Sequence, residues 1–352
     1  MMLLRDRSLL IRADGGPTIG MGHLMRSIAL AQAWRDLGAA VTLATAFPLD
    51  GFQGRVAREG LTSITLGVDP GSKQDAEATV ELARSARAGY VAMDGYSFGP
   101  DFQRTVSQAG VATACIDDYG HLDAYHVDMI VNQNLDSTDA LYKCRPDSTR
   151  LLLGAEFAML RRDFTNHARR SRVARTTGAR VLVTLGGADP QNVTKRIVQS
   201  LGDVPLDIEA AIVIGGANPH LSTVVEAAAA SDGCFRTFVD VPSLRRLMEW
   251  ADVIVCGGGT TCWEAAFIGV PMIVMVVAEN QVRIADALAN HGVAINLGDS
   301  AHIARATIAD SVQTLLLDQS RRERMSSTGR GIVDGFGARR VAMAIASLRG
   351  AA

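Results

Sequence analysis

Short apolar segments that end in glycine-rich turns recur along the chain, and each turn leads into a helical pattern. In the first half, SLLIRAD runs into GGPTIGMG and then into HLMRSIALAQAWRDLG, whose apolar residues recur at helical spacing. In the second half, VIVCGGG runs into TTCWEAAFIG in the same way. A strand, a tight turn and a helix in this order form a βα unit. A series of such units predicts a parallel sheet covered by helices.

Two series of these units predict two doubly wound α/β domains. The chain has 352 residues, more than the about 250–300 at which a single core stops growing. The pattern starts again at ARVLVTLGG, after an Arg-rich stretch. We expect an N-terminal Rossmann-like domain at 1–165, a linker at 166–178, a C-terminal domain at 179–335, and a terminal helix at 336–352 that packs back on the N-terminal domain. Open sheets bind ligands beyond the carboxyl ends of their strands, so two such domains facing one another would form a deep cleft.

Composition and charge exclude several classes of protein. The formal net charge is −2, so no global field favours nucleic acid or an acidic membrane. The basic run from Arg161 to Arg180 is interpreted as a solvated linker. The five cysteines include no CxxC pair, which argues against a disulfide framework or a structural zinc site. The amino terminus lacks a signal-peptide pattern, and the apolar runs are too short to span a membrane. We expect a cytoplasmic protein without membrane insertion.

The glycine turn after VIVC is suited to an anion. Gly257, Gly258 and Gly259 allow close approach of a ligand to the backbone, and free N–H groups at a helix start favour phosphate. Thr260 and Thr261 add hydroxyl groups. The turn lacks a Walker lysine and the dinucleotide spacing, so taken alone it fits a structural turn equally well.

Three polar residues near this turn extend the interpretation. Glu264, one turn into the helix, is placed to accept hydrogen bonds from ribose hydroxyls, and Asn280 and Gln281 after the next strand suit sugar hydroxyl or acetamido groups. Together they fit a nucleotide sugar. Separately, Glu264 is also a favourable charge near a helix N-terminus, and Asn280 and Gln281 also suit a turn and a cap.

A second glycine turn, TLGGADPQN, also follows a strand. Gly186 and Gly187 are expected to line a nucleotide site. For Asp189, capping of the next helix is the favoured interpretation.

His23 follows Gly20 and Gly22 at the start of the first long helix. The helix dipole there disfavours the imidazolium, and a neutral imidazole is what a general base requires. A capping or packing role is the alternative. Arg26, one turn further on, is expected to hold an anionic or polar group of the substrate.

Acidic residues follow several strands of the first half. Asp14, Asp94, Asp117 and Asp118 are candidates to orient His23 or to bind sugar hydroxyls, and solvated turns are the alternative. No His/Asp spacing supports a metal site strongly.

Several segments, in order along nearly the whole chain, resemble one known family. They are RADGGPTIGMGHLMRSIALAQAW, IDDYGHLDAYHVDMIVNQN, LLGAEFAMLRRDF, TLGGADPQN and GGGTTCWEAAFIGVPMIVMVVAENQ. The family is that of the UDP-2,4-diacetamido-2,4,6-trideoxy-β-L-altropyranose hydrolases of pseudaminic acid biosynthesis, the PseG family. Spore-coat polysaccharide proteins are close relatives, and the MurG transferases are more distant ones.

The resemblance implies a GT-B fold, with UDP held by the C-terminal domain and the catalytic group supplied by the N-terminal domain. It implies that His23 is the general base for water, that Glu264 contacts ribose, and that Asn280 and Gln281 contact the sugar. Backbone amides around Gly258, Gly259 and Thr260 would hold the pyrophosphate. The implied substrate is a UDP-amino sugar, with no metal or other cofactor.

Three other functions stay open at this point. A GT-B glycosyltransferase would use the same donor with an alcohol acceptor in place of water. A 2-epimerase of UDP-N-acetyl sugars has a two-domain fold of this type, and a binding module would keep the UDP pocket without catalysis. The sequence gives no guide to a protein partner.

Overall fold

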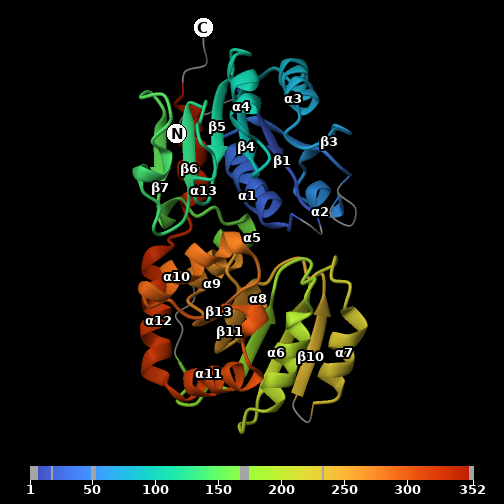
Figure 1. Ribbon diagram of the computed structural model, residues 1–352, viewed down its shortest axis with the longest axis vertical. Helices are drawn as coiled ribbons and strands as arrows, with labels where there is room; N and C mark the ends of the chain where they lie inside the picture. The colour runs from blue at the N-terminus through green and yellow to red at the C-terminus, as the bar shows by residue number, and fades with distance from the viewer. Residues whose placement is uncertain (1–6, 17–18, 49–52, 167–173, 232–233, 349–352) are drawn as a thin grey trace. The chain divides into compact units, whose positions relative to one another are not determined.

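The computed structural model describes residues 7–16, 19–48, 53–166, 174–231 and 234–348. The chain forms two compact units (Figure 1). The N-terminal unit comprises residues 1–165 and 335–352, and the C-terminal unit comprises residues 166–334. The expected linker at 166–178 therefore falls within the C-terminal unit, and its residues 167–173 lie outside the described residues.

The N-terminal unit is built on a seven-stranded parallel sheet with the strand order β3-β2-β1-β4-β5-β6-β7. Its strands are β1 (Ser8–Ala13), β2 (Ala40–Thr45), β3 (Thr62–Thr65), β4 (Ala88–Asp94), β5 (Ala112–Ile116), β6 (Met129–Asn132) and β7 (Arg150–Leu153). The central strands β4 and β5 are almost continuously buried, as expected when helices cover both faces.

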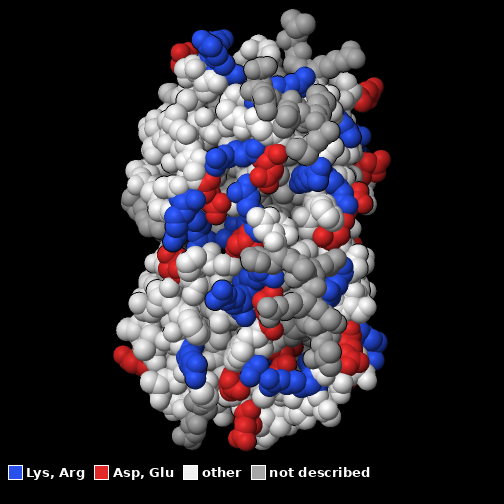
Figure 2. All heavy atoms as spheres, turned by 180° about the vertical axis from the view of Figure 1, so that it is seen from behind, with Lys and Arg blue, Asp and Glu red and all other residues white. Residues whose placement is uncertain are grey.

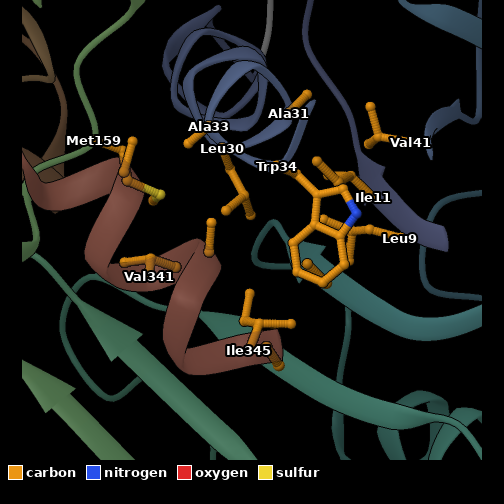
Figure 3. Packing of buried hydrophobic residues seen from close by; sticks show 14 of the residues in the cluster. Leu9, Ile11, Leu30, Ala31, Ala33, Trp34, Val41, Met159, Val341 and Ile345 are labelled. Carbon is orange, nitrogen blue, oxygen red and sulfur yellow. The ribbon is translucent and has the colours of Figure 1, made fainter. Parts of the chain in front are cut away.

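One face of this sheet is covered by α1 (Gly22–Asp36) together with α13 (Gly337–Ala346). Figure 3 shows Trp34 of α1 and Ile345 of α13 in the same apolar cluster as Ile11 of β1. Because α1 packs against both the sheet and α13, it is buried on nearly every side and lacks a clear polar face. Each large apolar side chain buried here contributes about 1.5–3 kcal/mol. The chain end at α13 is thus part of the N-terminal unit.

The opposite face packs against α3 (Lys73–Ser85) and α4 (Pro100–Ser107). The alternation along β1 accounts for the two faces, since Leu9 belongs to the α1 cluster and Leu10 to the α3 and α4 cluster. The remaining helices of this unit are α2 (Gln53–Arg58) and α5 (Arg162–Thr165), with 3-10 turns η1 (Asp139–Tyr142) and η2 (Ala155–Phe157).

The C-terminal unit repeats the design with a six-stranded parallel sheet in the order β10-β9-β8-β11-β12-β13. Its strands are β8 (Arg180–Thr184), β9 (Glu209–Ile214), β10 (Cys234–Val239), β11 (Val253–Gly257), β12 (Met272–Val276) and β13 (Ala294–Asp299). Its helices are α6 (Val193–Gly202), α7 (Leu221–Ala229), α8 (Arg245–Trp250), α9 (Thr261–Ile268), α10 (Val282–Asn290), α11 (Arg305–Leu317) and α12 (Gln319–Ile332), with 3-10 turns η3 (Glu279–Gln281) and η4 (Ser300–His302). The two doubly wound sheets confirm the fold expected from the sequence.

The strand order reverses between β1 and β4 in one unit and between β8 and β11 in the other. In doubly wound sheets, the crevice beyond the carboxyl ends of the strands at such a point is where ligands bind. The register pairs Ala13 with Asp94 and Asp94 with Ile116. The residues that follow β1, β4 and β5 therefore meet at the switch point of the N-terminal unit.

Charge is mixed over the surface. On the face drawn in Figure 2, Lys and Arg side chains are interspersed with Asp and Glu. Among the described residues, no helix is both long enough and apolar enough to cross a lipid bilayer.

Candidate active site

His23 stands at the first turn of α1, directly after a closed glycine loop. Gly16 and Gly20 close this loop with two backbone hydrogen bonds, N–H of Gly20 to O of Gly16 at 2.8 Å and N–H of Gly16 to O of Gly20 at 3.2 Å. Gly20 has φ +81°, a left-handed conformation that glycine adopts without the steric cost of a Cβ. The loop lets the chain leave β1 and start α1 with Gly22, which places His23 at the strand-end edge.

The partner of His23 is Asp94, the last residue of β4. The Nδ1 atom of His23 lies 2.7 Å from Oδ1 of Asp94, and Asp94 is fully buried. Burial opposes ionisation of Asp94, but the Arg26 and His23 charges and their hydrogen bonds hold its pKa below the usual value. Since an ionised carboxylate only accepts, His23 donates from Nδ1, and in the neutral ring Nε2 carries the lone pair. No described residue is a hydrogen-bond partner of Nε2.

Arg26 binds two carboxylates of its own unit, those of Asp94 and Asp118. Its Nε and Nη2 donate to the two oxygens of Asp94 at 2.8 and 2.7 Å, and its Nη1 and Nη2 donate to those of Asp118 at 2.5 and 3.0 Å. The guanidinium is buried and is fully engaged by these two carboxylates. The expectation that Arg26 holds an anionic or polar group of the substrate stays a prediction; in this structure Arg26 neutralises Asp94, which orients His23, and Asp118.

Asp118 completes this network from the end of β5. Burial opposes its ionisation, but the charge of Arg26 lowers its pKa to about 2. The hydroxyl of Tyr96 donates to Asp118 Oδ2 at 2.7 Å, and the Tyr96 ring meets the His23 ring edge-on with centroids 4.8 Å apart. Tyr96 was missed by the sequence analysis, although its place two residues after β4 is a signal that could have identified it.

Asp14 has its contacts with Ala46 and Arg12. Its Oδ1 accepts from the backbone N–H of Ala46 at 2.6 Å and lies 2.8 Å from Nη1 of Arg12. Arg12 is itself buried and makes a two-point contact with Asp75. Asp14 thus ties β1 to the end of β2, and the carboxylate that orients His23 is Asp94.

In the C-terminal unit, the glycine turn runs from β11 into α9 as predicted. No described residue accepts a hydrogen bond from the backbone N–H of Gly259 or Thr260. Both residues and Thr261 are half-buried, and a Cβ at Gly259 would meet nothing within 4 Å. Unpartnered N–H groups at a helix start, with hydroxyl groups beside them, form a favourable place for an anion.

The N–H of Gly258, unlike those of Gly259 and Thr260, already donates a hydrogen bond within the described part of the protein. It donates to Oε1 of Gln281 at 3.0 Å, and the same oxygen accepts from the N–H of Val277 at 3.2 Å. Gln281 therefore supports the glycine turn with its oxygen, and the Gly258 amide has an acceptor within the protein; the expected contact of Gln281 with the sugar stays a prediction. The Nε2 group of Gln281 has no acceptor among the described residues.

The other predicted residues of the C-terminal unit lie at the same strand-end edge. Glu264 is buried in the first turn of α9, and Asn280 is half-buried in η3. Gly186 follows β8 with φ +88°, and its carbonyl and that of Gly187 pack on the backbone of Gly215, where a Cβ would lie within 2.4 Å of both. The cap predicted for Asp189 is confirmed, since its carboxylate accepts from the N–H groups of Val193 and Thr194 at the start of α6.

The two edges can do different chemistry. The edge of the N-terminal unit holds an imidazole with an unpartnered lone pair, oriented by a buried carboxylate, which is the arrangement of a general base. The edge of the C-terminal unit holds amide and hydroxyl donors at a helix start, which suits phosphate. Within the described residues, no group of three or more His, Cys, Asp and Glu side chains is arranged to hold a metal ion.

Comparisons with known proteins found one family model and several similar proteins. Residues 181–335 match the glycosyltransferase family 28 C-terminal domain. The chain is 22% identical over 286 residues to the UDP-2,4-diacetamido-2,4,6-trideoxy-β-L-altropyranose hydrolase of Campylobacter jejuni, a match that covers 81% of this chain and 97% of that protein. It is 28% identical over 196 residues to the Bacillus subtilis spore coat polysaccharide biosynthesis protein SpsG, covering 55% of this chain and only 57% of SpsG.

Similarity to solved structures identifies the fold. The MurG structure from Acinetobacter baumannii superposes with a TM-score of 0.66 at 14% identity, over 97% of this chain and 99% of MurG. At that identity the likeness concerns the fold alone. The chain therefore has the GT-B fold, carries a glycosyltransferase family 28 C-terminal domain in its second unit, and resembles the PseG family of UDP-2,4-diacetamido-2,4,6-trideoxy-β-L-altropyranose hydrolases.

Proposed function

We propose that this protein hydrolyses a UDP-linked diacetamido-trideoxy sugar, UDP-2,4-diacetamido-2,4,6-trideoxy-β-L-altrose, to UDP and the free sugar, as a step of pseudaminic-acid-type nonulosonic acid biosynthesis. The observation that carries the proposal is the His23–Asp94 pair, with Nδ1 of His23 fixed at 2.7 Å and Nε2 without a partner among the described residues. The similarity to the Campylobacter jejuni hydrolase supplies the substrate.

In the proposed reaction, Nε2 of His23 takes a proton from water while the water oxygen attacks the anomeric carbon. The bond between that carbon and the oxygen of the β-phosphate breaks, and its electron pair leaves with UDP. The imidazolium that forms is stabilised by the ionised Asp94. Arg26 keeps Asp94 ionised.

The C-terminal unit has the complementary role in this proposal. The N–H groups of Gly259 and Thr260 and the positive end of the α9 dipole would bind the diphosphate and stabilise the charge that develops on it. Glu264 and Asn280 are proposed to contact the ribose and the sugar, respectively, and Gln281 to offer its Nε2 group to the sugar. The protein is proposed to act in the cytoplasm.

The test is turnover of the UDP-sugar with water as the sole acceptor and a chelator present, followed by NMR. We expect release of UDP and free sugar, and in ¹⁸O-labelled water the label should enter the sugar, because the proposed reaction breaks the bond at the anomeric carbon. Release only after an alcohol acceptor is added would indicate a glycosyltransferase. An epimerised sugar product would indicate a 2-epimerase, and UDP binding without turnover of any amino sugar would indicate a binding module.

A further inference from the structure

A second histidine–carboxylate pair lies beside the first one. Asp117 directly follows β5, next to Asp118, and its Oδ2 lies 2.8 Å from Nδ1 of His121. The His121 ring meets the Tyr96 ring edge-on, with centroids 5.2 Å apart. Since Tyr96 also contacts the His23 ring, a single aromatic ring separates the two imidazoles.

The surroundings of Asp117 fix which nitrogen of His121 carries the proton. Asp117 is fully buried, and Oδ1 accepts from the N–H groups of Tyr119 and Gly120, both at 2.7 Å. Oδ2 accepts from the hydroxyl of Tyr125 at 2.6 Å, in addition to His121. Burial opposes ionisation, but the hydrogen bond and charge of His121, with the other donors, lower the pKa of Asp117. An ionised Asp117 requires a proton on Nδ1 of His121, so the neutral ring presents Nε2 as an acceptor.

Nε2 of His121 lacks a hydrogen-bond donor in the described part of the chain. The His121 side chain is 10% exposed, and Nε2 is buried without a hydrogen-bond partner among the described residues. The same holds for Oδ1 of Asn134, whose Nδ2 donates to the backbone oxygen of Asp118 at 2.8 Å. A buried polar atom without a partner destabilises the folded state. Two such atoms at one strand-end edge are satisfied only by a molecule that brings donors, such as water or a bound ligand.

The kind of ligand follows from whether the unpartnered atoms donate or accept hydrogen bonds. Both unpartnered atoms are acceptors, and the neighbouring carboxylate of Asp118 is also an acceptor. A phosphate group offers acceptors too, so it would leave these atoms unsatisfied. A sugar with hydroxyl and acetamido N–H groups offers the donors that they lack.

We propose that His121 Nε2 and Asn134 Oδ1 bind the sugar by accepting hydrogen bonds from its N–H or O–H groups, which makes His121 a specificity-determining residue distinct from the base His23. This inference rests on the proposed function, because it takes the sugar of that substrate as the ligand. It assigns recognition of the amino sugar, rather than of phosphate, to this edge of the N-terminal unit.

Two substitutions of His121 separate binding from support of the fold. In His121→Asn, the amide nitrogen can replace Nδ1 and keep the bond to Asp117, but Nε2 is lost. In His121→Gln, the longer side chain can place an amide oxygen near the position of Nε2, but the bond to Asp117 is lost. We expect KM for the UDP-sugar to rise about tenfold in His121→Asn and less in His121→Gln, with kcat changing less than KM in both. The opposite order would overturn the proposal, because a residue that only anchors Asp117 needs Nδ1.

Tyr125→Phe is the matched control. It removes one hydrogen bond to Asp117 and leaves Nε2 of His121 untouched. We expect a lower midpoint of thermal unfolding with an unchanged KM. A rise in KM equal to that of His121→Asn would contradict the assignment, since the effect would then come through Asp117.

A readout without turnover keeps this test separate from the proposed function. In protein with ¹⁵N-labelled histidine, the Nε2 signal of His121 should report an unprotonated nitrogen and should shift when free 2,4-diacetamido-2,4,6-trideoxy-L-altrose is added, but not when UDP alone is added. No shift with the sugar, or an equal shift with UDP alone, would overturn the inference. Absence of hydrolysis by the wild-type protein would instead contradict the proposed function.

Discussion

The strand-end edges of the two sheets have the same topology and opposite chemistry. In the N-terminal unit, Asp94 and Arg26 are buried, the side chain of Asp118 is only 7% exposed, and each charge is matched by another at hydrogen-bond distance. In the C-terminal unit, the corresponding turn between β11 and α9 presents backbone N–H groups and threonine hydroxyls. Buried charges are retained only when they are paired, whereas backbone amides bind an anion without such a cost. One switch point is thus suited to moving a proton and the other to holding a phosphate.

The largest effect is expected from a substitution that removes the charge balance at the strand-end edge of the N-terminal unit. Arg26→Met leaves Asp94 and Asp118 buried without their cation, and we expect the free energy of unfolding of the N-terminal unit to fall by about 3–5 kcal/mol. Urea unfolding with pulsed hydrogen exchange, read in peptides from β4 and β11, reports the two units separately. The β11 peptides should change much less than the β4 peptides.

Arg104→Met is the matched control for this prediction. Arg104 pairs with Asp101 at 2.6 Å, but both side chains are exposed, by 48% and 94%. Exposed pairs contribute about 0–1 kcal/mol, so this variant should unfold almost as the wild type does. Equal losses in the two variants would show that the buried network does not hold the first edge together.

A smaller effect is expected when a charge is added to the second edge. Gly259→Asp has room for its Cβ, and it places a carboxylate where the diphosphate is proposed to bind. We expect UDP affinity, measured by calorimetry, to fall about tenfold, or about 1.4 kcal/mol. The free energy of unfolding should stay the same or rise by about 0.3–1 kcal/mol, because an acidic group near a helix N-terminus is favourable.

Gly89→Asp provides the control for added charge. Gly89 is exposed near the start of β4, away from the carboxyl ends of the strands. UDP affinity should be unchanged in this variant. If Gly259→Asp also bound UDP as tightly as the wild type, the assignment of the phosphate to the start of α9 would be wrong.

Much of the fold was predictable because its strands are buried apolar runs that end in glycine turns. The predicted strands at SLLIRAD and VIVCGGG became β1 and β11, and α1 and α9 follow them as expected. The sequence analysis missed β7 and β13, which lie at the sheet edges and are only partly buried. The apolar run of β7 has only three residues, and β13 interrupts its apolar residues with Asn296 and Gly298, so neither shows the longer run of a central strand.

The site was predicted in its residue types but not in its pairings. His23 and the four aspartates were all identified, yet their spacing did not reveal that Asp94, 71 residues away, is the partner. That pairing depends on the insertion of β4 beside β1, which is a property of the whole sheet. The bond between Gln281 and the Gly258 amide was missed, because the sequence does not show that Gly258 needs an acceptor for its N–H.

The most direct test of the division between the two edges is to measure turnover and UDP affinity side by side in His23→Ala. We predict that release of UDP with water as the acceptor falls by about 10²–10⁴-fold, because the general base is lost, while the Kd for UDP stays within about twofold of the wild-type value. Wild-type turnover in His23→Ala with normal UDP binding would contradict the role of His23. A parallel loss of UDP affinity would contradict the separation of proton chemistry from phosphate binding.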